Sequence, residues 1–107
     1  MSLADAAEPL QHFIKSGQVV IFAWETCPFC KKAKEILEPI TDPKDYKVYY
    51  VDKQPDGEDL RAEIKRVWNH ETVPAVFIGG KLIGGASEVE ELQKLGQLEK
   101  IVKPENP

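Results

Sequence analysis

The apolar run Val-Val-Ile-Phe-Ala-Trp at residues 19–24 constrains the fold of this 107-residue chain more than any other feature. A run without polar alternation is typical of a strand that is buried on both faces of a sheet. Pro28 follows at a position that suits the first turn of a helix. Apolar residues then recur at helical spacing at Ala33, Ile36, Leu37 and Ile40. A buried strand that leads directly into an amphipathic helix predicts an α/β fold.

The rest of the chain alternates in the same way. A helix is expected within residues 1–17, with Ser16-Gly17 as its stop, and a second strand over residues 46–51. A core-facing helix follows over 60–68, and the strands 74–78 and 81–83 form a hairpin through Gly79-Gly80. Ser87 with Glu90 three residues later reads as a capping box that opens a further helix.

One domain over residues 1–107 accounts for these elements, with a short helical stretch near 98–102 and a polar tail at 103–107. The two strands joined by the first long helix are expected to be parallel, and the hairpin extends the sheet in antiparallel fashion. The predicted architecture is a four-stranded mixed sheet flanked by helices.

Composition excludes several classes of function. The net charge is −4, which argues against a nucleic-acid partner. The longest apolar run is far shorter than the ~20 residues that span a bilayer, so no membrane association is expected. The first residues lack the features of a secretory signal, which favours a cytoplasmic location, or an organelle if a transit peptide has been removed. Two cysteines are too few for a disulfide-stabilised secreted scaffold.

Both cysteines lie in Cys27-Pro28-Phe29-Cys30, where the buried strand ends and the helix begins. Backbone N–H groups and the helix dipole favour a negative charge at this position, so a thiol there ionises easily. The thiolate is the reactive form in disulfide exchange. A Cys-x-x-Cys pair in such a strand–helix unit therefore indicates redox chemistry.

The two sulfurs are predicted to differ. At about 100° per residue from Cys30, the apolar stripe of the helix covers roughly 240° to 340°, so Cys30 borders the core. Cys27, at about 60°, lies outside the stripe, between Lys34 and Lys31 at about 40° and 100°. Cys27 is thus assigned as the nucleophile stabilised by these lysines, and Cys30 as the shielded resolving thiol.

Three other interpretations apply to the same residues. A structural disulfide across so short a loop gains only ~2 kcal/mol before strain. A zinc site needs about four ligands, and only His12 and His70 remain as further candidates, without ligand spacing. The lysines can also be simply the solvated face of a helix.

Three motifs make the chain resemble the dithiol glutaredoxins of the thioredoxin-like superfamily, over residues 19–102. They are the Cys-Pro-Phe-Cys centre, Thr72-Val73-Pro74 ahead of a strand, and Gly84-Gly85 followed by Ala86-Ser87-Glu88. The resemblance implies a thioredoxin-like fold and a glutathione site. It also implies that Pro74 is cis, a state found in only ~5–6% of X–Pro bonds.

The resemblance assigns roles within that glutathione site. Thr72, Val73 and Pro74 would meet the cysteinyl part of glutathione through the Val73 backbone. Gly85 would allow close approach, and the first turn at Ala86, Ser87 and Glu88 would take the γ-glutamyl carboxylate through its N–H groups. Phe29 joins the apolar stripe by its helical angle, although the aromatic residue of the family lines the rim of the groove.

The sequence departs from the family at Trp24, where glutaredoxins commonly place a Lys or Arg that meets the glycyl carboxylate of glutathione. Arg61 stands where the family often has Gln or Arg facing the same carboxylate, so it is the remaining candidate, or else an exposed helix arginine. We interpret Trp24 as core or groove wall.

The resemblance thus implies a monomeric glutathione-dependent oxidoreductase that reduces protein disulfides and protein–glutathione mixed disulfides, with glutathione as cosubstrate and no metal. Two alternatives remain. One is a protein that binds a [2Fe–2S] cluster through Cys27 and glutathione, although the ring of Pro28 hinders close approach. The other is a thioredoxin-like electron carrier. Visible absorption of anaerobically purified protein tests the first, and reduction by thioredoxin reductase without glutathione tests the second.

Overall fold

A computed structural model describes residues 12–53, 55, 57–70 and 73–103. Of the helix expected within residues 1–17, residues 12–14 are helical and residues 1–11 lie outside the described part of the chain. The polar tail from residue 104 onward also lies outside it. No helix among the described residues combines the length and the apolar character needed to span a membrane.

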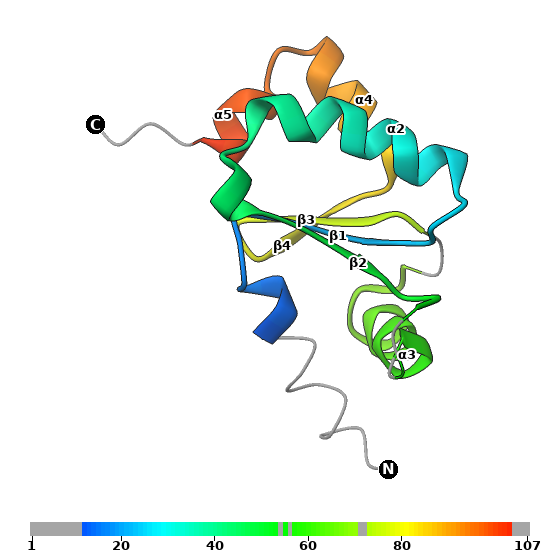
Figure 1. Ribbon diagram of the computed structural model, residues 1–107. Helices are drawn as coiled ribbons and strands as arrows, with labels where there is room; N and C mark the ends of the chain where they lie inside the picture. Colours follow the sequence, from blue (N-terminus) through cyan, green and yellow to red (C-terminus); the bar gives the residue numbers. More distant parts are fainter. Residues whose placement is uncertain (1–11, 54, 56, 71–72, 104–107) are drawn as a thin grey trace.

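The centre of the molecule is a four-stranded sheet in the order β2-β1-β3-β4 (Figure 1). The strands are β1 (Val19–Ala23), β2 (Tyr46–Tyr50), β3 (Ala75–Ile78) and β4 (Lys81–Gly84). β1 pairs in parallel with β2 and antiparallel with β3, and β3 pairs antiparallel with β4. The predicted mixed sheet is confirmed, including the parallel strand–helix–strand unit.

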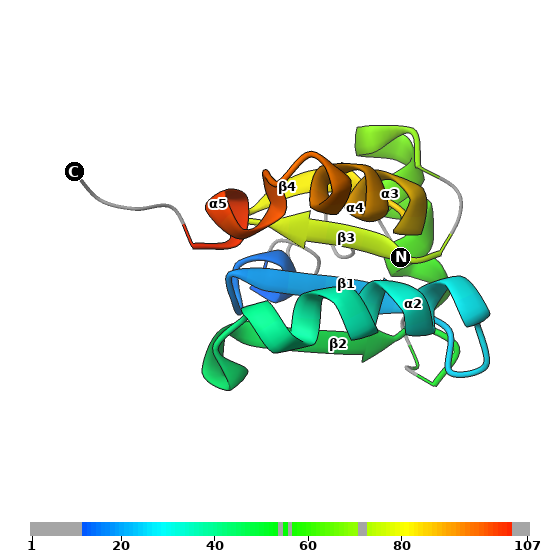
Figure 2. The same ribbon diagram turned by 90° about the horizontal axis from the view of Figure 1, so that it is seen from above.

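Helices cover both faces of this sheet. α2 (Pro28–Leu37), α4 (Ala86–Lys94) and α5 (Leu98–Val102) lie on one face, as Figures 1 and 2 show. α3 (Gly57–Trp68) lies on the other. Short 3₁₀ turns, η1 (Glu38–Ile40) and η2 (Pro43–Asp45), lead from α2 into β2. The helices expected from apolar spacing after residue 27 are therefore present, and α2 begins close to the end of β1.

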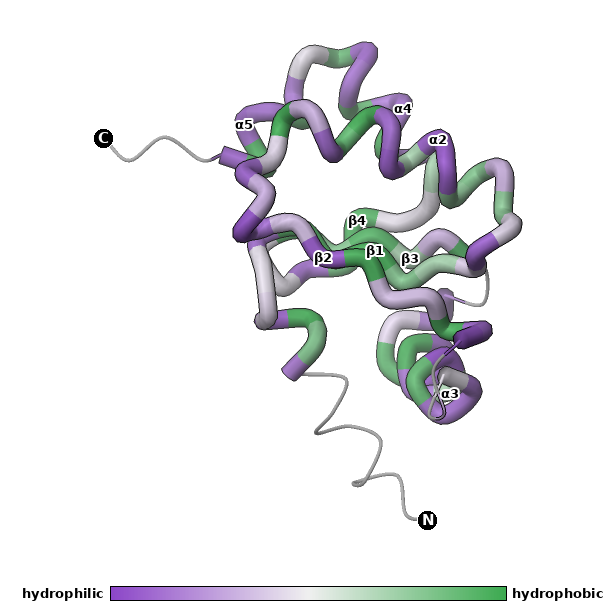
Figure 3. The backbone as a smooth tube through the Cα atoms, in the orientation of Figure 1, coloured by the Kyte–Doolittle hydropathy of each residue, from purple (hydrophilic) through white to green (hydrophobic). Residues whose placement is uncertain are grey.

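The alternation of side chains along β1 divides the core into two layers. Val19, Ile21 and Ala23 belong to the cluster beneath α2 and α4. Val20 and Phe22 belong to the cluster beneath α3. All five are buried, as expected for a strand covered on both sides, and Figure 3 shows the apolar colour concentrated along the central strands. The strand ends at Ala23, one residue before the end of the apolar run, and leaves Trp24 41% exposed.

The start of α4 differs from the expected capping box. The helix begins at Ala86 with Gly85 as its N-cap, and the Gly85 N–H donates to Oε1 of Glu88 over 3.1 Å. Glu90, the expected partner of Ser87, instead pairs with Lys32 of α2 at 2.6 Å. The predicted cap at Ser87 is thus wrong, because the helix already begins at Ala86 and Ser87 lies within its first turn.

Candidate active site

Cys27 stands at the N-terminus of α2, at the end of the sheet where β1 stops. It is the N-cap residue of that helix, with extended backbone angles, and the Cys30 N–H donates to its sulfur over 3.2 Å. The sulfur therefore accepts a backbone hydrogen bond at the N-terminal end of the helix. The local sequence explains the geometry, because Pro28 fits the first helical position and lacks an N–H.

Cys30 lies one turn further along α2 and faces the core. It is only 1% exposed, whereas Cys27 is partly exposed, and both are free thiols. Burial, together with a hydrogen bond to the neighbouring Cys27 and the charge of that residue, raises the pKa of Cys30 to about 12. The predicted inequality of the two sulfurs is confirmed in their burial. Cys30 is held as a neutral thiol next to an accessible sulfur.

The lysines of α2 have separate contacts. Lys34 Nζ donates to the Tyr50 hydroxyl over 2.6 Å and lies 5.1 Å from the centre of the same ring. Its charge also acts to lower the pKa of Cys30 against the effect of burial. Lys31 is exposed. A role for Lys31 and Lys34 in stabilising the Cys27 thiolate stays a prediction, and Tyr50 is a partner of Lys34 that sequence reasoning missed.

A groove of about 280 Å³ opens beside this end of the sheet. Three segments distant in sequence line it, namely the first turn of α2, the residues before β3, and the start of α4. The lining residues are Phe29, Val73, Pro74, Gly85, Ala86, Ser87 and Glu88. These are seven of the nine positions that the resemblance assigned to a glutathione site. Thr72 lies outside the described residues, and Arg61 does not line the groove.

The cis bond expected before β3 and the expected position of Phe29 can both be compared with the groove. The Val73–Pro74 peptide bond is cis, as the resemblance implied. The Pro74 carbonyl lies 3.2 Å from Nε2 of His70. Phe29 is 66% exposed, so its expected place in the apolar stripe is wrong. The helical angle gives the direction of a side chain but not whether a neighbouring element covers it, and Phe29 stands at the groove instead.

Trp24, the residue after β1, is in contact with Arg61 of α3. The Arg61 guanidinium of α3 lies 4.9 Å from the centre of the Trp24 ring. The half-exposed ring is neither core nor, among the lining residues, part of the groove wall. The expected place of Trp24 in the core is therefore wrong, and its expected place at a groove wall stays a prediction. Sequence reasoning missed the pair because no local pattern links two residues on different elements.

The loop between β1 and α2 is also tied to the chain that follows β2. The Glu25 N–H lies 3.3 Å from both carboxylate oxygens of Asp52, and Glu25 pairs with Lys53 at 3.3 Å. The first residues after two parallel strands thus hold each other in place. This arrangement fixes the backbone from which Trp24 and Cys27 project.

Comparison with known proteins shows which proteins this chain resembles. The family model described as Glutaredoxin matches residues 19–83. Glutaredoxin-2 of Schizosaccharomyces pombe is 36% identical over 89 residues, covering 83% of this chain and 79% of that protein. Glutaredoxin-1 of Sus scrofa is 36% identical over 87 residues, covering 79% of this chain and 81% of that protein.

Solved structures agree with the sequence comparison. The solution structure of the dithiolic glutaredoxin 2-C-Grx1 from Trypanosoma brucei brucei has a TM-score of 0.80 and 47% identity, over 88% of this chain and 95% of that one. The crystal structure of a buckwheat glutaredoxin–glutathione complex has a TM-score of 0.86 and 30% identity, over 94% and 89%. The fold is the thioredoxin-like fold that these proteins share.

Proposed function

The chain belongs to the glutaredoxin family, and from this premise we propose how its two sulfurs and its groove carry out the reaction of the family. It is a glutathione-dependent thiol–disulfide oxidoreductase whose cysteine spacing is that of the dithiol type. One observation carries the division of labour: Cys27 is accessible at a helix N-terminus with a backbone N–H on its sulfur, while Cys30 is buried and kept neutral.

The first reaction is the removal of glutathione from a protein. The Cys27 thiolate attacks the glutathionyl sulfur of a protein–glutathione mixed disulfide. The bond between the two substrate sulfurs breaks, and the protein leaves as a thiolate that takes up a proton. A second glutathione, as its thiolate, then attacks the glutathionyl sulfur bound to Cys27. This step releases glutathione disulfide and regenerates the Cys27 thiolate.

The second reaction is the reduction of a disulfide within a protein, and it requires Cys30. The Cys27 thiolate first attacks one sulfur of the protein disulfide; the S–S bond breaks, and the other sulfur leaves as a thiolate that takes up a proton. Cys27 is then held in a mixed disulfide and no longer carries a negative charge. Two of the causes that raise the pKa of Cys30, the hydrogen bond with Cys27 and its charge, are then removed. Cys30 therefore becomes easier to deprotonate at the moment it is needed. Its thiolate attacks the Cys27 sulfur, releases the protein thiolate and leaves a Cys27–Cys30 disulfide for two glutathione molecules to reduce.

Glutathione occupies the groove next to Cys27 in this proposal. The Val73 backbone pairs with its cysteinyl part, with Thr72 and Pro74 on either side. The N–H groups of the first turn of α4 have no partner within the helix, so those of Ala86 and Ser87 suit the γ-glutamyl carboxylate. Support comes from the groove lining and from the buckwheat glutaredoxin, whose crystal structure contains glutathione.

The remaining contacts are at the rim. Gly85 has no side chain to obstruct the ligand, and Glu88 acts by holding the Gly85 N–H. Phe29 provides an apolar wall, and Arg61 pairs with the glycyl carboxylate. The partners are glutathione and glutathionylated or disulfide-containing proteins, on which this chain acts as a monomer in the cytoplasm.

Reduction of hydroxyethyl disulfide by glutathione, coupled to glutathione reductase, tests the assignment. Cys27→Ser is expected to lose about three orders of magnitude or more in kcat, as expected for loss of a nucleophile. Cys30→Ser is expected to retain deglutathionylation but to lose reduction of an intramolecular protein disulfide. Full activity of Cys27→Ser, or equal loss of both reactions in Cys30→Ser, would contradict the proposed division of roles.

A further inference from the structure

Trp24 is an exposed indole at a position that is close to the chemistry but outside the groove. Its backbone carbonyl accepts a hydrogen bond from the Cys27 N–H over 3.4 Å. A backbone hydrogen bond from Trp24 also acts to lower the pKa of Cys30. The backbone of Trp24 therefore contacts both cysteines. Its side chain, 41% exposed, contributes little to the core, which leaves its size unexplained by packing.

The contact that Trp24 does make is with Arg61. α3, which carries Arg61, packs on the face of the sheet opposite α2 and α4 (Figure 1). The ring of Trp24, the residue after β1, has the Arg61 guanidinium 4.9 Å from its centre. An arginine side chain has several rotatable bonds, and holding it in one place costs rotamer entropy. A cation–π contact offsets part of this cost.

We propose that Trp24 is a positioning residue for glutathione: its ring holds the Arg61 guanidinium at the cysteine end of the sheet, where it meets the glycyl carboxylate. The inference rests on the proposed function, which places that carboxylate near Arg61. In place of a cationic side chain after β1, this chain has an aromatic ring that brings a cation from α3. The charge next to the ligand is kept although the residue that usually carries it is absent.

The sizes of the expected effects follow from the two interactions. Arg61→Ala removes a charge-assisted hydrogen bond to a carboxylate and is expected to raise the KM for glutathione about tenfold. Trp24→Ala removes an exposed cation–π contact and is expected to raise this KM about three- to fivefold. In both variants kcat is expected to change less than about twofold, because Cys27 and the N–H on its sulfur are unaltered.

The decisive experiment compares glutathione with its glycyl monoethyl ester, which lacks the negative charge at that end. Wild-type protein is expected to have a lower KM for glutathione than for the ester, and Trp24→Ala and Arg61→Ala are expected to lose most of this preference. Trp24→Phe keeps an aromatic face and is expected to retain part of the preference for glutathione over the ester. Val67→Ala removes another exposed apolar side chain, 48% exposed on α3, and serves as the matched control with the wild-type preference.

The double variant Trp24→Ala/Arg61→Ala separates an action through Arg61 from an independent one. We expect the KM of the double variant for glutathione to equal that of Arg61→Ala, because Trp24 then has no guanidinium to hold. An additional rise in KM in the double variant would overturn the positioning role, and so would an unchanged ester preference in Trp24→Ala while Arg61→Ala loses it. An unchanged preference in Arg61→Ala would instead refute the proposed glycyl contact, and absence of any glutathione-dependent activity in wild-type protein would refute the proposed function itself.

Discussion

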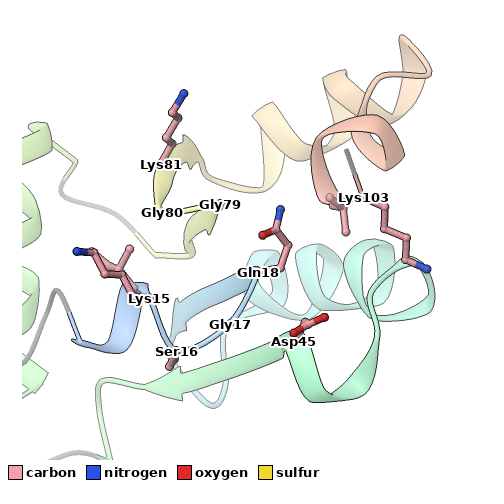
Figure 4. A pocket seen from close by; sticks show the side chains of 11 residues that line it. Lys15, Ser16, Gly17, Gln18, Asp45, Gly79, Gly80, Lys81 and Lys103 are labelled. Carbon is pink, nitrogen blue, oxygen red and sulfur yellow. The ribbon is translucent and has the colours of Figure 1, made fainter. Parts of the chain in front are cut away.

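The two ends of the central sheet each carry a cavity, and the larger of the two lacks the chemistry. The groove beside Cys27 has a volume of about 280 Å³, whereas a cavity of about 860 Å³ lies at the opposite end (Figure 4). Lys15, Lys81 and Lys103 stand around the larger cavity, and Figure 4 shows their side chains pointing in different directions. They do not converge on a common point where an anion would bind.

The polar groups of the larger cavity serve the packing of the chain. Gln18 Nε2 lies 3.4 Å from the Ile101 carbonyl, and the Gly79 N–H donates to the Gln18 carbonyl over 2.8 Å. At the smaller groove an accessible sulfur lies beside a helix N-terminus, and the nine-residue α4 begins at the groove wall. A reactive group with convergent donors, rather than cavity volume, therefore marks the site.

The largest expected effect concerns how reactivity is divided at the cysteine end. A pKa raised from 9.0 to about 12 lowers the thiolate fraction of Cys30 about a thousandfold at neutral pH relative to an ordinary thiol. Iodoacetamide at pH 7 is therefore expected to modify Cys27 and leave Cys30 unmodified, as peptide mass spectrometry will show. Modification of both cysteines at similar rates would break the contrast between the sulfurs.

That contrast could be predicted from sequence because it depends on local geometry. The position of Cys30 against the core follows from helical angles within one element, and the burial of β1 follows from its own composition. The exposure of Phe29, the Gly85 cap and the pairing of Trp24 with Arg61 were not predictable in the same way. Each depends on where an element ends or on what a distant element brings to it. The groove residues before β3 and at the start of α4 were recognised only through motifs shared with a family.

Gly17, at the larger cavity, is expected to matter for stability alone. A Cβ atom there would stand 2.6 Å from the Asp45 carbonyl oxygen and 3.1 Å from Cγ of Lys47. Because a backbone atom has to shift, we expect Gly17→Ala to lower the free energy of unfolding by about 1–3 kcal/mol. Urea denaturation measures this loss. The KM for glutathione of the folded variant is expected to stay at the wild-type value. A raised KM would show that glutathione binds at the end of the sheet that carries the larger cavity.

Alkaline pH is expected to destabilise the reduced protein through Cys30. Its pKa is raised in the folded state, so between pH 9 and about 12 the unfolded chain binds fewer protons than the folded one. The stability contributed by the neutral thiol is present below pH 9 and is lost as pH rises, at up to about 1.4 kcal/mol per pH unit.

Urea denaturation of reduced wild type and Cys30→Ala over this pH range isolates the effect. The slope of stability against pH is expected to be shallower in the variant. The buried hydroxyl of Tyr46, whose pKa burial also raises, titrates in both proteins and cancels. Identical slopes would show that Cys30 ionises as readily in the folded protein as in the unfolded chain.

Gly85, at the groove, is expected to matter for glutathione binding rather than for stability, which is the reverse of Gly17. Its backbone is extended, with a φ of −102°, and a Cβ atom would meet only the Pro74 carbonyl oxygen at 3.4 Å, an ordinary contact. Gly85→Ala is therefore expected to cost less than about 1 kcal/mol of stability. The added methyl group occupies space in the groove and is expected to raise the KM for glutathione about fivefold. An unchanged KM would mean that the ligand does not approach Gly85 closely.

The smallest effect is expected from charge at the larger cavity. Lys15→Glu combined with Lys103→Glu reverses two charges, but these side chains lie at the end of the sheet away from Cys27. At an ionic strength of 0.15 M the screening length is about 8 Å, so exposed charges at that end have little influence on glutathione at the other. The KM for glutathione is expected to change less than about twofold, in contrast to Arg61→Ala. A rise as large as that of Arg61→Ala would show that the whole-molecule field, rather than a placed guanidinium, attracts the ligand.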